Sequence, residues 1–360
     1  MSTARSIATL ARWLGPWADA TKAPDVAIVD ERLEIPPRAG TASATTSIRV
    51  RLYRPHGLRP GEERAAYLLA HGLHFQGPDD VRMDRFCKIL AAAGHLVIAP
   101  FIPSYLALVP RRAAIDDFER VFDARRRWTH KKPVVLSISF GSLLAFALAA
   151  KHGPALDGLV VFGGYADFHE TMTFCLTGRV PSGRDAKRDP LNQPVVLMNL
   201  LADMRPAPAD AEAVSKAWRA YVERTWGRPE MKARERFTAI ADELAPDVPE
   251  SVRELFHVGI GTRPGATELA MDALTRFDAA QLDPMPYVAR VRGRVDLVHG
   301  TDDDVIPYEH SQDLARRLVA ADACVHITGL YGHTGAQVPK VSALVEELAT
   351  MVRVLRVFAR

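Results

Sequence analysis

The sequence predicts an α/β fold in which helices cover both faces of a mostly parallel central sheet and an inserted helical cap interrupts it. Two observations predict this class. Short apolar runs alternate with helix-like stretches near both ends of the chain, whereas a long middle part holds successive helix-like stretches and no clear strand. Buried strands joined by helices form parallel sheets. We therefore expect three segments, residues 1–165, 166–288 and 289–360.

The first segment contains most of the predicted strands. Residues 25–54 alternate between apolar and polar positions in two stretches, which is typical of paired strands. Short apolar runs predict buried strands at 65–72, 95–102, 133–139 and 156–164. Turn and capping residues predict helices from Asp79 or Asp80 to Gly94, around Ile115 to Phe122, and from Ser142 to Gly153.

The middle segment, 166–288, predicts a block of helices separated by Pro-containing joints. The main candidates are residues 192–204, 210–226, 229–245 and 267–277. Strand and helix alternate again in the last segment, with strands expected near 293–300 and 323–333 and a final helix from about Lys340. Such an insertion commonly lies over the carboxyl ends of the strands, where ligands bind. We expect it to line a pocket for a substrate.

Composition excludes several classes of protein. The 360 residues are 48% hydrophobic and 25% charged, with a net charge of +3. The charges are scattered, whereas nucleic-acid binding needs basic residues gathered on one face. Cys87, Cys175 and Cys324 are odd in number and lack zinc-ligand spacing. The sequence therefore predicts free thiols in the cytoplasm, no metal and no cofactor, and leaves the oligomeric state open.

The N-terminal stretch has an amphipathic pattern. Ile7, Leu10, Leu14 and Trp17 fall on one helical face, and charged and turn residues break the stretch in a way not typical of a signal peptide. We expect a helix packed on the body; the alternative is a helix at a membrane surface or at the entrance for a substrate. The longest charge-free apolar run, 134–150, fits strand, turn and helix, so no stable membrane insertion is expected.

Three serines lie where a buried strand meets a helix, in the stretch VVLSISFGSLL at 134–144. A nucleophile on such a tight turn needs small residues two positions before and two positions after it. Ser139 has Ser137 before it and Gly141 after it. Ser137 lacks a glycine two positions on, and Ser142 already lies in the helix. Ser139 is therefore the predicted nucleophile.

These residues resemble the α/β-hydrolase superfamily over roughly residues 45–165 and 285–358. The stretch Ser137–Ile138–Ser139–Phe140–Gly141 departs from the usual pattern only at Ser137, where the family has glycine, and is interpreted as a variant elbow. The resemblance implies the α/β-hydrolase fold and a catalytic acid and histidine that follow the serine in chain order.

The family pattern assigns the remaining members of the triad. Asp302, Asp303 and Asp304 compete in the stretch HGTDDDVIP, and the spacing to Gly300 and Pro307 implies Asp303. The histidine implied on the following loop is His333, with His326 a poorer candidate because it falls within the expected strand. Asp167 is an alternative acid, although capping of the next helix is the preferred interpretation.

Two backbone N–H groups are expected to hold the oxyanion. One belongs to Phe140, directly after the nucleophile. The other belongs to Leu73 in the His-Gly segment AHGLHF, with His74 second. The stretch 259–265, GIGTRPG, has glycines at the wrong spacing for a dinucleotide loop and does not lie between a strand and a helix.

The resemblance implies a serine hydrolase that cleaves a carboxylic ester of a small molecule through an acyl-enzyme. An acyltransferase or amidase with the same triad is the first alternative, because the motifs do not show which acceptor takes the acyl group. A catalytically silent ligand-binding protein on the same scaffold is the second, and only Ser137 favours it.

Overall fold

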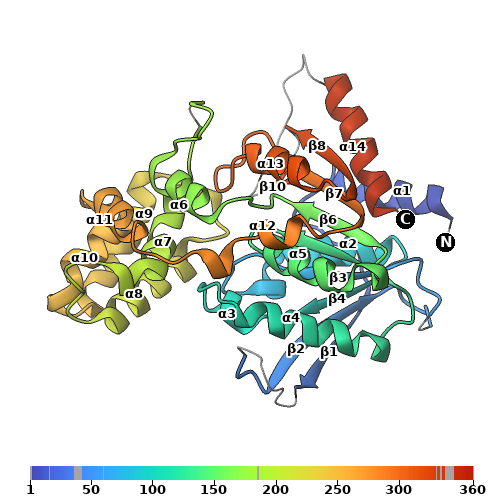
Figure 1. The fold of residues 1–360 in the computed structure, drawn as a ribbon, viewed down its shortest axis with the longest axis horizontal. Coiled ribbons are helices and arrows are strands. Elements are labelled where there is room, and N and C mark those ends of the chain that lie inside the picture. The colour runs from blue at the N-terminus through green and yellow to red at the C-terminus, as the bar shows by residue number, and fades with distance from the viewer. Residues whose placement is uncertain are drawn as a thin grey trace. The chain divides into compact units, whose positions relative to one another are not determined.

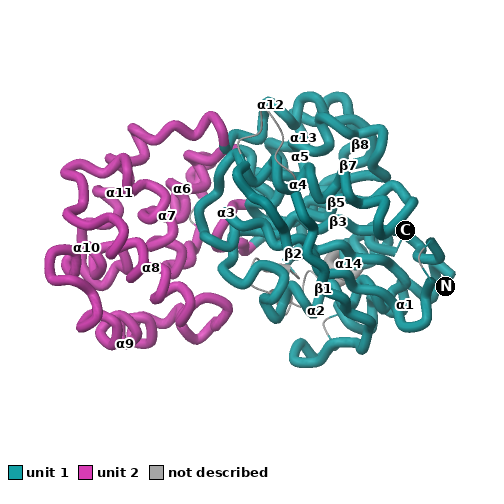
Figure 2. Tube along the Cα trace, turned by 90° about the horizontal axis from the view of Figure 1, so that it is seen from below, with its two compact units in different colours: residues 1–166, 282–301, 308–360 teal, residues 167–281, 302–307 magenta. Residues whose placement is uncertain are grey.

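A computed structural model describes residues 2–15, 17–35, 43–59, 61–184, 186–329, 331–332, 335–336 and 344–359. The chain forms two compact units (Figure 2). The core unit comprises Met1–Ala166, Leu282–Thr301 and Tyr308–Arg360, and the helical unit comprises Asp167–Gln281 and Asp302–Pro307.

The core unit is built on an eight-stranded sheet in the order β1-β2-β4-β3-β5-β6-β7-β8 (Figure 1). Its strands are β1 Ala27–Glu34, β2 Ser47–Arg54, β3 Ala66–Ala70, β4 Leu96–Pro100, β5 Pro133–Ile138, β6 Gly158–Phe162, β7 Gly293–Gly300 and β8 Ala321–Thr328. β2 pairs antiparallel with β1 and β4, and the other pairs from β4 to β8 are parallel. The predicted fold class is confirmed. A separate two-stranded ladder joins β9 Tyr331–Gly332 to β10 Gly335–Ala336.

Helices cover both faces of the sheet. The α-helices of the core unit are α1 Thr3–Leu14, α2 Val81–Ala92, α3 Pro103–Leu106, α4 Ala113–Asp123, α5 Gly141–His152, α12 Met285–Val288, α13 Glu309–Arg317 and α14 Leu344–Phe358. On one face α1, α2 and α14 bury a cluster of apolar side chains against the strands. On the other, α5 contacts α4 and α12 (Figure 1). Every residue of β3 and β4 is buried, as expected for strands covered on both sides.

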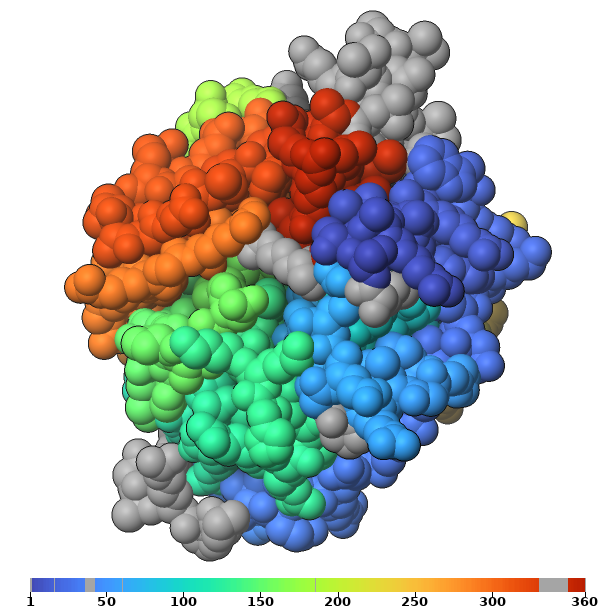
Figure 3. Space-filling model, turned by 90° about the vertical axis from the view of Figure 1, so that its right-hand side faces the viewer, coloured from blue at the N-terminus to red at the C-terminus, as the bar shows by residue number. Residues whose placement is uncertain are grey.

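The N-terminal helix packs against the body, as its amphipathic pattern predicts. Leu10 is fully buried, and Ile7 and Leu14 contact the same apolar cluster. Figure 3 shows the first residues, in dark blue, beside the red C-terminal helix. Trp17 differs from the prediction: α1 ends at Leu14, and the indole beyond it is 63% exposed. Among the described helices, none is both long and apolar enough to cross a membrane.

Capping residues lie at the ends of two core helices where the sequence predicts them. Asp80 is the N-cap of α2 and accepts hydrogen bonds from the N–H groups of Arg82 and Met83. Gly94 follows the end of the same helix with φ +99°, a left-handed conformation that favours glycine. Gly153 is the C-cap of α5.

The helical unit consists of α-helices joined by short 3-10 turns. Its α-helices are α6 Phe168–Thr177, α7 Gln193–Leu200, α8 Ala211–Thr225, α9 Arg234–Leu244, α10 Glu250–Ile260 and α11 Ala266–Leu274. The 3-10 turns are η4 Pro190–Asn192, η5 Leu201–Asp203, η6 Pro229–Lys232 and η7 Ala245–Asp247. Trp218 of α8 is fully buried and donates its indole N–H to the carbonyl oxygen of Phe256 at 3.1 Å.

The glycine-rich stretch 259–265 joins two helices of this unit. Gly261 caps α10 with φ +82°, and Gly265 precedes α11 with φ +102°. A side chain on Gly259 would lie 2.3 Å from the Trp218 ring, so glycine is needed for close packing there. The stretch is a turn between helices, which agrees with rejecting it as a dinucleotide loop.

The boundaries of the helical unit differ from the predicted segments at two points. Residues 282–288 belong to the core unit, because Leu282 and Val288 are buried and α12 contacts α5. Residues Asp302–Pro307 contact the helical unit, although they lie between β7 and α13 in the chain. The predicted segments place this loop in the core because it follows β7 in the chain. Its contacts place it in the helical unit.

Candidate active site

Ser139 occupies a strained turn between β5 and α5. Its φ is +53°, and among the described non-glycine residues only Leu108 also has a positive φ. Its N–H donates to the carbonyl oxygen of Phe162 on β6 at 2.8 Å, and its own carbonyl accepts from Ser142 at 3.0 Å. Positive φ at a non-glycine residue costs free energy and is concentrated at functional sites. The geometry is that of a nucleophile elbow.

Gly141 allows the first turn of α5 to cross the end of β3. A Cβ atom at this position would lie 1.9 Å from the carbonyl oxygen of Ala70 and 2.9 Å from that of His71. No side chain fits there without moving one of the two backbones. The requirement for a small residue after the nucleophile, inferred from spacing, therefore has a direct steric cause in this chain.

Ser137 lies in β5 between Ala70 of β3 and Val161 of β6. It is fully buried, and its hydroxyl has no hydrogen-bond partner among the described residues. The turn at Ser139 nevertheless has the elbow geometry. A serine in place of the usual glycine is therefore compatible with the tight turn.

The His71–Gly72 segment brings the predicted oxyanion loop to Ser139. A Cβ on Gly72 would lie 3.1 Å from the Ser139 Cβ, so the two backbones are in direct contact. The His71 Nδ1 donates to the Gly72 carbonyl oxygen at 2.7 Å, and its Nε2 accepts from the N–H of Ile102 at 3.1 Å. These partners define a neutral ring, and burial lowers the pKa of His71 to about 4.

The His71 contact also orients the peptide that carries the Leu73 N–H. In a trans peptide the C=O and N–H groups point in opposite directions. Because the Gly72 carbonyl points to the His71 ring, the Leu73 N–H points away from it. His71 is a supporting residue that the sequence interpretation did not single out. The position of His71 directly before Gly72 was the feature of the sequence that could have indicated this supporting role.

Phe140 is held from two sides. The Tyr105 hydroxyl donates to the Phe140 carbonyl oxygen at 2.9 Å, and the Phe140 ring contacts the Tyr165 ring with centroids 4.9 Å apart. Phe140 is also the N-cap of α5, and the positive end of the helix dipole favours negative charge at this position. The structure therefore brings together Ser139, Phe140 and the loop that carries Leu73. Nothing in the local sequence pointed to Tyr105 or Tyr165.

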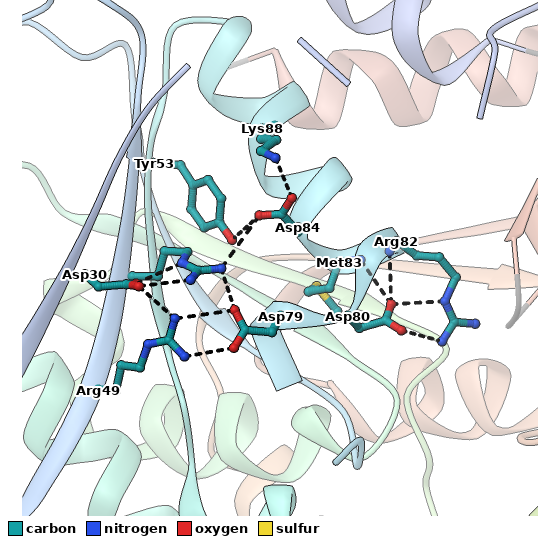
Figure 4. Close-up of polar contacts among 10 residues, drawn as sticks. Asp30, Arg49, Tyr53, Asp79, Asp80, Arg82, Met83, Asp84 and Lys88 are labelled. Atoms are coloured by element: carbon teal, nitrogen blue, oxygen red, sulfur yellow. Dashed lines mark hydrogen bonds and ion pairs between the residues drawn. The ribbon is translucent and has the colours of Figure 1, made fainter. Parts of the chain in front are cut away.

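A charged network anchors the segment that follows this loop (Figure 4). Arg49 and Arg51 of β2 both bind Asp79, in the 3-10 turn η1 Gly77–Asp79, with N–O distances of 2.8 Å and 2.6 Å. The same two guanidinium groups bind Asp30 of β1 and hold its pKa at about 2. β1, β2 and the end of the loop are therefore joined by ion pairs.

Asp303 is the most buried of the three competing aspartates. It is 6% exposed, whereas Asp302 is exposed and Asp304 is half-buried. Asp303 Oδ1 accepts hydrogen bonds from the N–H groups of Val305 at 2.9 Å and Ile306 at 2.8 Å. These two bonds fix the direction of the carboxylate within the Asp302–Pro307 loop of the helical unit.

The other candidates have structural partners or lie outside the described residues. His333 belongs to the residues that are not described, so its role stays a prediction. His326 lies on β8 with its Nε2 3.2 Å from Asp296 Oδ1 of β7. Asp167 is the N-cap of α6 and accepts from the Glu170 N–H at 2.8 Å, which is the role that its sequence position favoured.

Among the residues that the structure describes, Glu119, Asp123 and His152 of the core unit form one group of potential metal ligands. Glu119 Oε1 already binds the Lys151 ammonium at 2.5 Å and the His152 ring at 2.7 Å. The lysine therefore supplies the positive charge that a metal ion would bring. We assign this group no metal.

No family model matches the sequence, and no curated protein matches it. Similar solved structures include Pyrococcus horikoshii acylaminoacyl peptidase, with a TM-score of 0.48 and 10% identity over 94% of this chain and 41% of that one. The 2-hydroxy-6-oxo-6-phenylhexa-2,4-dienoate hydrolase of Rhodococcus sp. strain RHA1 matches with a TM-score of 0.46 and 16% identity, over 93% of this chain and 99% of that one. A thermophilic esterase from Thermogutta terrifontis matches with a TM-score of 0.41 and 18% identity, over 91% of this chain and 97% of that one. This chain thus spans less than half of the peptidase.

The topology identifies the fold. One strand, β2, runs antiparallel within an otherwise parallel sheet whose order is β1-β2-β4-β3-β5-β6-β7-β8, with a sharp turn from β5 into α5. These features define the α/β-hydrolase fold, in agreement with the resemblance found in the sequence. Because one fold hosts many activities, the activity depends on the chemistry of the site.

Proposed function

We propose that this chain is a serine hydrolase that cleaves carboxylic esters, with Ser139 as nucleophile, His333 as base and Asp303 as the acid. The observation that carries the proposal is the strained φ of +53° at Ser139, in contact with the backbone at Gly72. A nucleophile elbow presents the serine hydroxyl at the tip of the turn, and Ser139 is 6% exposed. Without an adjacent base it would be a poor nucleophile.

The proposed reaction has two halves. His333 takes the hydroxyl proton of Ser139 while Oγ bonds to the acyl carbon and the carbonyl electron pair moves to oxygen. The N–H groups of Phe140 and Leu73 stabilise that oxyanion, and loss of one such donor typically costs about a hundredfold in rate. Collapse expels the alcohol, which takes the proton from His333. Water, deprotonated by His333, then releases the carboxylic acid and regenerates Ser139.

Labelling with a fluorophosphonate tests the nucleophile. We expect a single adduct on the native protein, mapped to Ser139 by peptide mass spectrometry, and none on the heat-denatured protein. Ser139→Ala should remove the adduct, and Ser137→Ala should keep it as the matched control. An adduct at another serine, or equal absence of labelling in native and denatured protein, would overturn the assignment and favour the ligand-binding alternative.

A panel of p-nitrophenyl esters and matching anilides tests the bond that is cleaved. Ester hydrolysis should exceed anilide hydrolysis, and added alcohol should not divert the product to a new ester. Anilide cleavage at a comparable rate would indicate an amidase, and diversion to a new ester would indicate an acyltransferase. The rate should fall as His333 becomes protonated, with a midpoint at a pH of about 6 to 7.

A further inference from the structure

The loop that carries Asp303 is bound to the helical unit by main-chain and side-chain contacts. The Asp189 N–H donates to the Asp304 carbonyl oxygen at 2.8 Å, and the Cys175 thiol lies 3.4 Å from the Val305 carbonyl oxygen. Cys175 is on α6, and Asp189 precedes η4. Two segments of the insertion therefore hold a loop that lies more than a hundred residues later in the chain.

Lys232 links the same two segments by charge. Its ammonium lies 2.9 Å from Asp189 Oδ2 and also forms a short ion pair with Asp304 Oδ2. The side chains are largely withdrawn from water, with exposures of 21% for Lys232, 7% for Asp189 and 17% for Asp304. Screening by solvent and salt is weaker for such a pair than for one at the surface. Despite its burial, which opposes the effect, the two carboxylates raise the pKa of Lys232.

The ammonium also balances a concentration of negative charge around the loop. Asp303 and Asp304 are adjacent in sequence, and the carboxylates of Asp189 and Asp303 both raise the pKa of the nearby Cys175 thiol, after burial as the main cause. Loss of Lys232 would remove the ammonium that binds the carboxylates of both Asp189 and Asp304. Like charges in such a setting repel, and the loop would relax away from them.

We propose that Lys232 is a positioning residue that holds the Asp303 loop in its working conformation, so that the helical insertion controls the catalytic acid. This inference rests on the proposed function for the role of Asp303. The contact chain has three steps: Lys232 binds Asp304, the neighbouring residues Val305 and Ile306 donate to Asp303 Oδ1, and the carboxylate direction follows. A lysine with a purely structural role would affect the stability of the helical unit alone.

The test compares Lys232→Met, which removes the charge, with Lys232→Arg, which retains it. Lys216→Met is the matched control, because Lys216 is an exposed lysine on α8 in the same unit. Lys232→Met should lower kcat for ester hydrolysis by about tenfold to a hundredfold with KM nearly unchanged, since small displacements of catalytic groups have effects of this size. Lys232→Arg should retain most of the activity, and Lys216→Met all of it.

The pH profile separates positioning from stability. A carboxylate beside an imidazole favours its protonated form, so loss of the Asp303 contact should move the acid limb of kcat to lower pH. A Lys232→Met protein with an unchanged acid limb, and with a loss of activity that matches its loss of folded protein in a thermal melt, would overturn the proposal.

Hydrogen exchange of the peptide spanning 300–308 decides the structural part independently of turnover. We expect faster exchange of the Val305 and Ile306 amides in Lys232→Met, and wild-type exchange in Lys232→Arg and Lys216→Met. If wild-type protein fails the fluorophosphonate and ester tests, the proposed function fails, while faster exchange would still support the positioning of the loop. Unchanged exchange in Lys232→Met would overturn the inference even if the hydrolase assignment holds.

Discussion

The Tyr105 hydroxyl donates a hydrogen bond to the main-chain carbonyl oxygen of Phe140, the residue directly after the proposed nucleophile, at 2.9 Å. Both residues are buried, and Tyr105 also packs edge-on against the His71 ring with centroids 5.9 Å apart. One side chain therefore contacts both segments that are proposed to supply the oxyanion N–H groups.

Replacement of Tyr105 by Phe tests this contact. Loss of the hydroxyl removes one hydrogen bond from the Phe140 carbonyl oxygen, which also accepts from the Leu143 N–H at 3.3 Å. A hydrogen bond of this kind contributes about 0.5 to 1.5 kcal/mol of stability. We expect kcat for ester hydrolysis to fall with little change in KM, because the proposed oxyanion donor at Phe140 becomes less well held. Steady-state kinetics and thermal melts measure both effects. Tyr287→Phe in α12 is the control and should leave both quantities at wild-type values.

The strained backbone at Ser139 predicts different stabilities for two inactive variants. Glycine at 139 adopts a φ of +53° without steric cost, whereas alanine retains the clash. Ser139→Gly should therefore raise the free energy of unfolding by about 1 kcal/mol relative to Ser139→Ala. Urea unfolding of the two proteins checks this difference, and equal stability would mean that the turn carries no strain.

The crossing of α5 over β3 makes position 141 intolerant of any side chain. Gly141→Ala places a Cβ 1.9 Å from the Ala70 carbonyl oxygen, so the elbow must open or the protein must unfold. We expect loss of fluorophosphonate labelling and a lower melting temperature. Gly153→Ala at the other end of α5 is the matched control, because its Cβ would meet no atom closer than 3.9 Å and its φ is −40°.

Ser137 is expected to be dispensable. Its buried hydroxyl has no partner among the described residues, and removal of such a group relieves a desolvation cost. Ser137→Ala should be as stable as wild type or more stable, with fluorophosphonate labelling of Ser139 intact. A large loss of labelling in this variant, measured beside its thermal melt, would assign Ser137 a direct role in the site.

Burial of neutral His71 predicts a loss of core-unit stability in mild acid. The unfolded chain binds a proton at His71 with a pKa near 6.5, whereas the folded chain does so at about 4. The contribution is fully present above pH 6.5, declines as pH falls between about 6.5 and 4, and levels off below. The decline reaches about 1.4 kcal/mol per pH unit in that range.

Urea unfolding of wild type and His71→Gln at several pH values isolates this contribution. The variant lacks the titrating group, so its stability should fall less steeply between pH 6.5 and 4. Buried His95, whose pKa is lowered to about 3, contributes in the same direction in both proteins. Parallel pH dependences for the two proteins would show that His71 is not held neutral.

Local patterns in the sequence predict the parts of the molecule that depend on local rules. Alternating and continuous apolar runs identify the strands, and the spacing around Ser139 identifies the elbow because that turn is determined by five consecutive residues. The supporting contacts of Tyr105, Tyr165 and Lys232 connect residues that are distant in the chain. Such contacts leave no periodicity to detect, and the attachment of Asp302–Pro307 to the helical unit was missed for the same reason.

A hydrogen bond within the core unit joins the residues on either side of the helical insertion. The Tyr165 hydroxyl, just before the insertion begins, donates to the carbonyl oxygen of Leu282, just after it ends, at 2.5 Å. The next residue, Ala166, donates its N–H to His310 of α13 at 3.0 Å. The segment 167–281 therefore leaves and rejoins the core unit at one hydrogen-bonded pair of residues, separately from the Asp302–Pro307 loop. Because these hydrogen bonds lie within the core unit, we expect the sheet of that unit to keep its strand order when residues 167–281 are changed in length or sequence.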